Sequence, residues 1–346
     1  MASKVRVILG CMTFGPAHTP TARITSLEDT KIIFKYFKDH GYSEIDTARV
    51  YTAGEQEAWT AAAGYKIDFG FDIATKCYPN QAGMHSTSEL PKYLNRSLAE
   101  LKTDSVDIFY LHAPDRSVPF LETLQAVDKL YNDGKFKIFG ISNYTAYEVA
   151  ELVTLARDHG LVQPTLYQAR YNVITRNIED ELIPALRHYG LDLVIYNPLA
   201  GGLFSGKYNK STGVPESGRF SAKSQQGEMY RSRYFRDVYW DALDLVQLVA
   251  EKHSLTMLEI ALRWMVHHSQ LKLGSARGLT GDGIIIGVSS LTQMEDDLSA
   301  IEKGPLPEDV VESLDKAWKI VKSDVTPYWH GELVYKFDKQ KYATNM

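Results

Sequence analysis

The sequence predicts an α/β fold, a (β/α)8 TIM barrel in which eight parallel strands alternate with helices. Three observations support this prediction. Apolar patches of strand length alternate with longer stretches of helical period, an order typical of parallel sheets with right-handed crossovers. Several patches, such as VDIFYL and LVIY, are continuously apolar, as strands buried on both faces are. Eight such strand patches can be counted, and eight strand–helix units close a barrel.

The predicted elements follow from these patterns in chain order. The predicted strands are 5–12, 43–47, 71–76, 106–112, 136–142, 165–169, 193–196 and 283–287. The predicted helices are 27–39, 55–66, 89–101, 119–131, 146–158, 178–188, 235–252, 255–267 and 307–321. A further helix is expected after the run GVSSLTQ.

Starts and stops of these helices agree with capping preferences. Ser26 precedes the first helix with Asp29 three residues on, and Gly41 follows that helix. Gly134 and Gly160 follow two later helices. Serine favours a helix start and glycine a helix end, so the alternation of the elements is supported locally.

The competing architecture is an open, doubly wound sheet. That fold usually binds a dinucleotide at a G-x-G-x-x-G turn after its first strand. Here the first strand runs into GCMTFGP, which lacks this pattern. No internal repeat, low-complexity tract or linker is evident, so the sequence predicts one barrel domain over residues 1–346.

Two segments extend beyond a bare barrel. Residues 201–233 follow the seventh strand and are rich in Gly, Ser, Lys and Arg; a loop this long is usually a lid, a binding loop or disordered. We predict a cofactor and substrate loop. Residues 323–346 form a C-terminal tail with five aromatic residues, so at least part of it is expected to dock. These residues are Tyr328, Trp329, Tyr335, Phe337 and Tyr342.

Composition excludes several classes of protein. The chain has a net charge of -5, which argues against nucleic-acid and membrane-surface binding. No apolar run approaches the ~18 residues of a membrane span. The start MASKVRV lacks the apolar segment of a secretory signal, and the end ATNM is not a targeting address. Cys11 and Cys77 are the two cysteines, so we expect a reduced, cytoplasmic chain.

Titratable and polar residues recur at the carboxyl ends of the predicted strands. The second strand ends at Asp46, with Tyr51 in the loop beyond. Each such residue alone could be a turn cap, a surface residue or a core residue. Together they would meet at one rim, where parallel barrels keep their chemistry. The other residues are Lys76, His112, Ser142, Asn143, Gln168, Tyr196 and Asn197.

This combination favours carbonyl reduction. A Lys76 cation beside Tyr51 should favour the phenolate and pull the phenol's pKa down, with Asp46 holding the cation. His112 could hydrogen-bond a carbonyl oxygen. No cysteine or serine nucleophile paired with a general base is evident, and no histidine or cysteine spacing is typical of metal ligands. We therefore predict no metal site. The hydride must come from a cofactor, because no side chain supplies one.

Seven motifs distributed over nearly the whole chain carry a family resemblance. They are EIDTARVY, IATK, FYLHAPD, GISNY, LYQARYN, YNPLAGGLFSGKY and IIIGVSSLTQMEDDL. In these motifs the chain resembles the aldo-keto reductases, NADPH-dependent (β/α)8 barrels. The phrases YLHAPD, NPLAGGL, LRWMVHHSQL and YRSRYF resemble the aflatoxin-aldehyde and succinic-semialdehyde reductase subgroup.

The resemblance implies Tyr51 as the proton donor and His112 as the residue that orients the carbonyl. Lys76 and Asp46 would tune the phenol. It also implies NADPH/NADP+ as cofactor: amide and hydroxyl groups hold the carboxamide, an aromatic residue stacks on the nicotinamide, and a glycine loop wraps the pyrophosphate. The implied cofactor residues are Ser142, Asn143, Gln168, Tyr196, Asn197, Pro198, Leu199, Gly201, Leu203, Gly206, Lys207, Arg219, Gly287, Ser289, Gln293 and Asp297.

The chain departs from the family pattern in two places. Thr52 follows Tyr51 where many members have Gly, and the tail continues past Trp329, with His330 near the position where an Arg often ends the subgroup's chains. Arg231 and Arg233 of the YRSRY run remain. We expect these arginines and Trp329 to join Tyr51 and His112 in binding substrate, and the aromatic tail favours a large, flat carbonyl compound.

Two other functions stay open at this stage. Potassium-channel β subunits resemble aldo-keto reductases and act as cofactor-bound regulatory proteins, although this chain lacks a long N-terminal extension. A barrel glycosidase would need two opposed carboxylates, and Asp46 has no convincing partner, since Asp115 lies in a loop. The expected partner is a small carbonyl compound, and a homodimer stays open.

Overall fold

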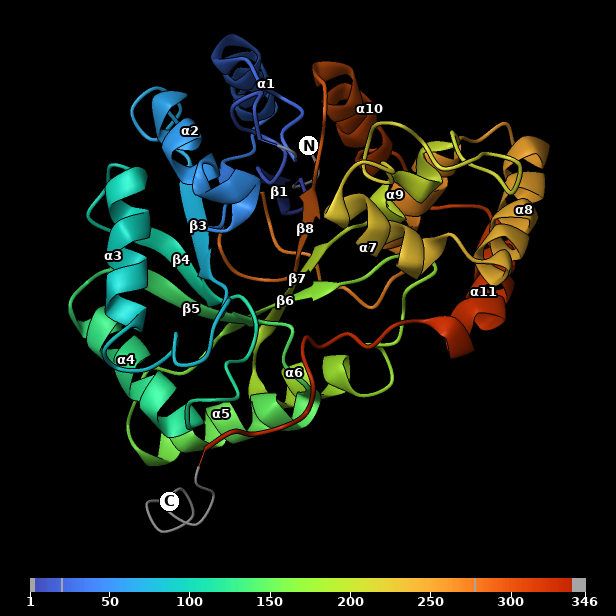
Figure 1. Ribbon diagram of the computed structural model, residues 1–346. Helices are drawn as coiled ribbons and strands as arrows, with labels where there is room; N and C mark the ends of the chain where they lie inside the picture. Colours follow the sequence, from blue (N-terminus) through green and yellow to red (C-terminus); the bar gives the residue numbers. More distant parts are fainter. Residues whose placement is uncertain (1–3, 20, 277, 338–346) are drawn as a thin grey trace.

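Eight parallel strands close into a barrel in sequence order (Figure 1). This computed structural model describes residues 4–19, 21–276 and 278–337. Strand β1 pairs with both β2 and β8, which closes the sheet. The predicted fold class is therefore confirmed. The strands are β1 (Val7–Gly10), β2 (Glu44–Asp46), β3 (Asp72–Cys77), β4 (Val106–Leu111), β5 (Phe136–Ser142), β6 (Leu166–Arg170), β7 (Asp192–Tyr196) and β8 (Gly283–Ile286).

The helices lie outside this barrel and cover the strands (Figure 1). Helix α1 begins as predicted, because the Ser26 hydroxyl accepts a hydrogen bond of 3.2 Å from the Asp29 amide. Helices α8 and α11 pack against each other. The α-helices are α1 (Leu27–Asp39), α2 (Gln56–Ala62), α3 (Leu90–Glu100), α4 (Phe120–Asn132), α5 (Ala146–Asp158), α6 (Leu182–Tyr189), α7 (Gln225–Tyr234), α8 (Asp237–Lys252), α9 (Met257–His267), α10 (Leu291–Ile301) and α11 (Glu308–Val321). Among the described residues, the short 3-10 helices are η1 (Tyr51–Gly54), η2 (Ala200–Ser205) and η3 (Lys322–Asp324).

The interior of the barrel is filled by side chains. A compact apolar cluster of strand residues lies inside it, while a larger cluster fills the layer between strands and helices. At β5 the packing requires glycine: a Cβ on Gly140 would lie 2.3 Å from the ring of Tyr110. At the amino-terminal end, Arg6 and Glu44 form a buried bidentate ion pair with both contacts at 2.8 Å. The solid interior leaves the carboxyl ends of the strands as the place for a site.

The segment 201–233 differs from the continuous loop that the sequence suggested. It contains part of η2 and most of α7. Helix α7 begins where the Ser224 hydroxyl accepts from the Gly227 amide at 3.0 Å. Its sequence, QQGEMYRSRY, includes a glycine and has no clear apolar face, so periodicity gave no helix there.

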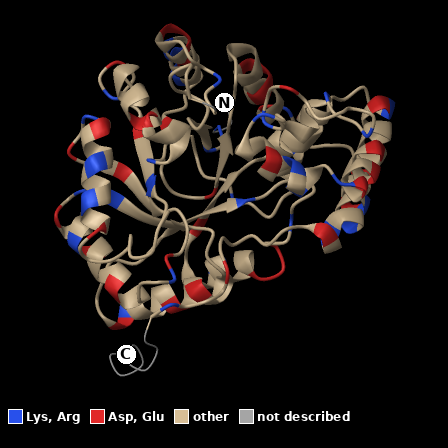
Figure 2. Cartoon of the chain, in the orientation of Figure 1, with Lys and Arg blue, Asp and Glu red and all other residues tan. Residues whose placement is uncertain are grey.

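The C-terminal tail docks on the barrel as far as the structure describes it. Beyond α11 the chain crosses in front of the barrel and runs along α5 (Figure 1). Residues 338–346, including the aromatic Tyr342, lie outside the described residues. Positively and negatively charged residues are interspersed along the outer helices (Figure 2). Within the described ranges, none of the helices has the length and apolar character that a membrane crossing requires.

Candidate active site

An ammonium group at the centre of the rim joins three predicted site residues. Lys76 lies in β3 with its side chain fully buried, and it pairs with Asp46 at the end of β2. The Lys76 Nζ also donates to the Thr47 carbonyl at 2.8 Å and to the Tyr51 hydroxyl at 3.2 Å. Gln168 of β6 donates to the second Asp46 oxygen at 2.9 Å. The carboxyl ends of β2, β3 and β6 therefore hold one connected polar cluster.

His112 completes the predicted catalytic set. It directly follows β4, and its backbone amide donates to the Cys77 carbonyl at 2.8 Å. Its ring packs edge to face against Tyr51, with centroids 5.9 Å apart and an interplanar angle of 82°. Both residues keep part of their surface exposed. The phenol and the imidazole thus share an accessible part of the rim where one carbonyl oxygen could meet both.

The protonation states in this cluster are set mainly by burial. Burial, reinforced by the Asp46 carboxylate, raises the pKa of the Tyr51 phenol well above its usual value of 10.0. Burial, with help from the Lys76 ammonium, lowers the pKa of the His112 imidazole well below its usual 6.5. Burial also lowers the pKa of Lys76, against the opposing pull of Asp46. A neutral phenol and a neutral imidazole therefore face the site.

One sequence-based expectation was wrong here. Lys76 was expected to pull the pKa of Tyr51 down, but the structure raises it. The reason is that Asp46 neutralises the ammonium at close range, while removal of the phenol from water penalises the phenolate. The phenol can still act as an acid, because an alkoxide is a stronger base than a phenolate.

Three amide and hydroxyl side chains form a second, connected group beside the first. Ser142 donates to the Gln168 carbonyl at 2.8 Å. The Asn143 amide donates to the Ser142 hydroxyl at 2.9 Å and to the His112 carbonyl at 2.8 Å. The Tyr196 hydroxyl donates to the Asn143 side-chain oxygen at 3.2 Å. These bonds orient donors and acceptors of the kind that a carboxamide needs.

The loop after β7 has an unusual backbone. Asn197 and Ala200 have positive φ angles of 67° and 51°, and Gly201, Gly202 and Gly206 are also left-handed. The Asn197 side chain accepts from the Gly201 amide and donates to the Tyr234 hydroxyl at 2.8 Å. Successive left-handed residues and glycines allow close backbone approach to an anion.

The other predicted loop residues occupy varied places. Pro198 and Leu203 are buried, while Lys207 is exposed. Arg219 lies over the Tyr230 ring, with its guanidinium carbon 5.2 Å from the centroid. The Arg219 Nη1 atom is buried and has no hydrogen-bond partner among the described residues, so this cation has capacity for an anionic ligand.

The start of α10 lies beside a hollow in the surface. Ser290 caps the helix, and Gln293 accepts from the Ser289 amide at 2.8 Å. A hollow of about 310 Å³ is lined by Ser289, Ser290 and Arg23 among others. Burial raises the pKa of Asp297 in the same helix to about 8, while Gly287 is exposed just before the helix.

The three further residues predicted to bind substrate have different surroundings. Arg231 is turned to the loop backbone, where its Nη1 donates to the Phe220 carbonyl at 2.8 Å, so its guanidinium organises the loop. Arg233 lies 5.6 Å from the Tyr230 ring centroid. Trp329 is partly buried and packs edge to face on Tyr328 at 5.1 Å.

Sequence reasoning missed several rim residues. Arg170 is the last residue of β6 and is 4% exposed, one position beyond the predicted strand end. Extending that strand by one residue would have placed it on the rim. Tyr78 and His330 were also missed. The Tyr78 ring contacts both His112 and His330, and these contacts join distant parts of the chain.

No group of three or more potential metal-ligating side chains occurs within residues 4–19, 21–276 and 278–337. Both cysteines, Cys11 and Cys77, are buried and free.

Comparisons with known proteins find similar sequences over most of this chain. A model of the Aldo/keto reductase family matches residues 6–319. The mouse (Mus musculus) protein named Aflatoxin B1 aldehyde reductase member 2 is 40% identical over 331 residues, which cover 93% of this chain and 87% of that protein. The human (Homo sapiens) Aldo-keto reductase family 7 member A3 is 39% identical over 331 residues, covering 93% of this chain and 96% of that protein. Aldo-keto reductase pigE from Monascus ruber is 39% identical over 340 residues, covering 94% and 97%.

Proposed function

The chain belongs to the aldo/keto reductase family, and we propose that it reduces aldehydes or ketones to alcohols with NADPH as hydride donor and Tyr51 as proton donor. Relatives named as aflatoxin B1 aldehyde reductases support a carbonyl substrate. One observation supports the role of Tyr51 as the proton donor. Its hydroxyl oxygen accepts the hydrogen bond from Lys76, so its own proton is free for a substrate oxygen.

The residues on the rim fit a nicotinamide cofactor. Ser142, Asn143 and Gln168 offer oriented donors and acceptors for the carboxamide. The left-handed loop after β7 offers backbone amides for a pyrophosphate. Arg219, with its buried unpaired Nη1, could serve phosphate groups, including a 2′-phosphate. When bound, the cofactor would supply the hydride that no side chain can supply.

The side chains then perform the acid–base part of the reaction. The neutral His112 imidazole can donate one N–H to the carbonyl oxygen and so orient it. As hydride adds to the carbonyl carbon, negative charge develops on that oxygen and the Tyr51 O–H proton moves to it. Lys76 stabilises the resulting phenolate through its existing hydrogen bond, and Asp46 keeps the ammonium in place. Stabilising charge where it develops is a principal source of catalysis.

A Tyr51→Phe variant tests this proposal. It should keep NADPH affinity within about twofold, while turnover falls by about 10²- to 10⁴-fold, the usual contribution of a positioned general acid. NADPH oxidation would be followed over a panel of aldehydes, diketones and aromatic ketones, with cofactor affinity measured by tryptophan fluorescence. Tyr131→Phe, on the outer helix α4, is the matched control. Near wild-type turnover in Tyr51→Phe would remove Tyr51 from the mechanism. Cofactor binding by the wild-type protein without turnover on any compound of the panel would favour a regulatory, cofactor-bound protein.

A further inference from the structure

The chain after α11 forms a strap, defined here as residues 325–337, that is tied to the rim at several points. Arg170 Nη2 donates to the Thr326 carbonyl at 2.9 Å and to its hydroxyl at 2.8 Å. The His330 amide donates to the Asn143 carbonyl at 3.0 Å. The Lys336 amide donates to the Arg116 carbonyl at 2.8 Å. The strap therefore joins the ends of β4, β5 and β6.

A buried ion pair holds the middle of the strap. Arg116 pairs with Glu148 through contacts of 2.7 and 3.0 Å, and the two side chains are 6% and 0% exposed. The same guanidinium donates to the His330 carbonyl at 2.6 Å. Glu148 also accepts from Thr145 at the start of α5 and from the Tyr335 hydroxyl at 2.8 Å. We call Arg116 and Glu148 the latch, because they fix the strap to the beginning of a helix.

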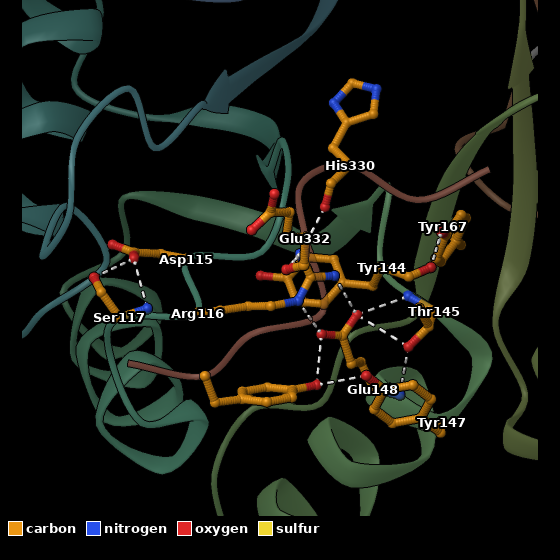
Figure 3. A network of polar contacts seen from close by, with 11 residues as sticks. Asp115, Arg116, Ser117, Tyr144, Thr145, Tyr147, Glu148, Tyr167, His330 and Glu332 are labelled. Carbon is orange, nitrogen blue, oxygen red and sulfur yellow. Dashed lines mark hydrogen bonds and ion pairs between the residues drawn. The ribbon is translucent and has the colours of Figure 1, made fainter. Parts of the chain in front are cut away.

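The backbone of His330 is held on both sides, by the latch at its carbonyl and by Asn143 at its amide. Its amide is bonded to Asn143 and its carbonyl to Arg116. Figure 3 shows the carbonyl directed toward Arg116 and the imidazole projecting away from the network. The orientation of the ring is therefore set by contacts that do not involve the ring itself.

The His330 ring stands at the end of a row of rings that leads to the proton donor. It contacts Tyr78 with centroids 6.1 Å apart. Tyr78 contacts His112 at 5.4 Å, and His112 contacts Tyr51 at 5.9 Å. All four side chains keep some exposed surface. The row forms one wall of the rim, with the reacting groups at one end and His330 at the other.

The chemistry of His330 is that of a neutral hydrogen-bonding group. Burial, with the nearby Arg233 and Arg170 cations, lowers the pKa of its imidazole to about 4. Its Nδ1 atom is buried and has no partner within the described part of the chain, and no hydrogen bond to Nε2 is found there. A neutral imidazole recognises an uncharged oxygen through a hydrogen bond and forms no ion pair with a carboxylate.

We propose that His330 is a substrate-binding residue that hydrogen-bonds a second, uncharged oxygen of a flat aromatic carbonyl compound, and that the latch positions it for this contact. The inference rests on the proposed function, since it places the first oxygen at Tyr51 and His112. The aromatic body of the substrate would lie along the wall of rings, where aromatic contacts are favourable. The second oxygen would lie at the far end of this row, beside the His330 ring.

The test compares benzaldehyde with its ortho-, meta- and para-hydroxy derivatives, using wild-type protein and His330→Phe, which keeps a ring but loses the hydrogen bond. For at least one hydroxy isomer, His330→Phe should lower kcat/KM by about 3- to 10-fold, as expected for one neutral hydrogen bond. Benzaldehyde should change by less than about twofold. His330→Gln, which restores a donor and an acceptor, should recover part of the loss.

The latch is tested with Arg116→Met, and Arg116→Lys serves as the conservative variant. Arg116→Met should raise KM for the same hydroxy isomer and leave kcat for benzaldehyde near the wild-type value, a split that general destabilisation would not produce. Arg116→Lys should recover part of the change. Equal effects of His330→Phe on both substrates, or none, would overturn the inference alone. Absence of wild-type turnover on every aldehyde would overturn the proposed function and this inference with it.

Discussion

Replacing Lys76 by Met should damage both stability and catalysis, and the two effects can be separated. Lys76 and Asp46 have side chains that are 0% and 5% exposed. Without the ammonium, the Asp46 carboxylate keeps the Gln168 contact at 2.9 Å but loses its countercharge. Removing one partner of a buried pair typically costs about 3–5 kcal/mol. We expect a loss of that size in the free energy of unfolding.

The second substitution isolates the cause of this loss. Asp46→Asn in the Lys76→Met background removes the uncompensated charge, while its amide oxygen can still accept from Gln168. The double variant should recover stability to within about 1–2 kcal/mol of wild type, because both buried groups are then neutral. Turnover should stay at least about 10²-fold down in both variants, since neither can stabilise the Tyr51 phenolate.

Urea denaturation followed by tryptophan fluorescence measures stability, and NADPH oxidation measures turnover. Wild-type stability in Lys76→Met, or a double variant as unstable as the single one, would refute the account of the buried pair. Wild-type turnover in either variant would refute the role of Lys76.

Three further predictions address other parts of the molecule. Arg6→Met should cost about 3–5 kcal/mol of stability, because it leaves Glu44 unpaired at the amino-terminal end of the barrel. The kcat of the folded protein should stay within about twofold of wild type, and a large fall in kcat would contradict this prediction. Gly201→Ala should weaken NADPH binding by about 5- to 10-fold, because Gly201 has φ 73° and a Cβ would lie 2.6 Å from the Tyr230 ring. Fluorescence titration measures the NADPH affinity. An unchanged affinity would count against a phosphate-binding role for the loop. Burial raises the pKa of the Asp297 carboxyl to about 8. Between about pH 4 and 8 this carboxyl therefore keeps a proton in the folded protein that it has lost in the unfolded chain. As the pH rises through this range, the group lowers the free energy of unfolding by up to about 1.4 kcal/mol per pH unit. Asp297→Asn should abolish that decline in thermal unfolding, and an unaltered pH profile would refute the assignment.

The alternation of elements predicted the barrel and much of the rim, for a geometric reason. Parallel strands end at one edge, so a residue at the end of one strand must lie near residues at the ends of its neighbours. This is why Asp46, Lys76 and Gln168 could be brought together from sequence, and the structure places them in hydrogen-bond contact. The rule works only where the strand end is read correctly, and a one-residue error left out Arg170.

Two features could not be derived from sequence patterns. The sign of the pKa shift at Tyr51 depends on how much solvent the fold removes and on how closely Asp46 neutralises Lys76, and both are tertiary properties. The strap contacts join residue 116 with residues 330 and 336. No periodic pattern links positions so far apart in the chain. The aromatic content of the tail indicated docking, but not where it would dock.

Because the pKa of Tyr51 is raised, the proposed proton transfer depends on a strong base being formed in the site. A phenol with a pKa above its usual value stays protonated at neutral pH, so proton donation requires a base stronger than phenolate. A carbonyl oxygen is not such a base until hydride addition turns it into an alkoxide. Because the Tyr51 oxygen already accepts from Lys76, the phenolate formed then is stabilised without rearrangement of the site. In the proposed mechanism, burial and the ammonium therefore act at different stages. Burial would keep the proton on Tyr51 before hydride transfer, and Lys76 would stabilise the phenolate that forms after it.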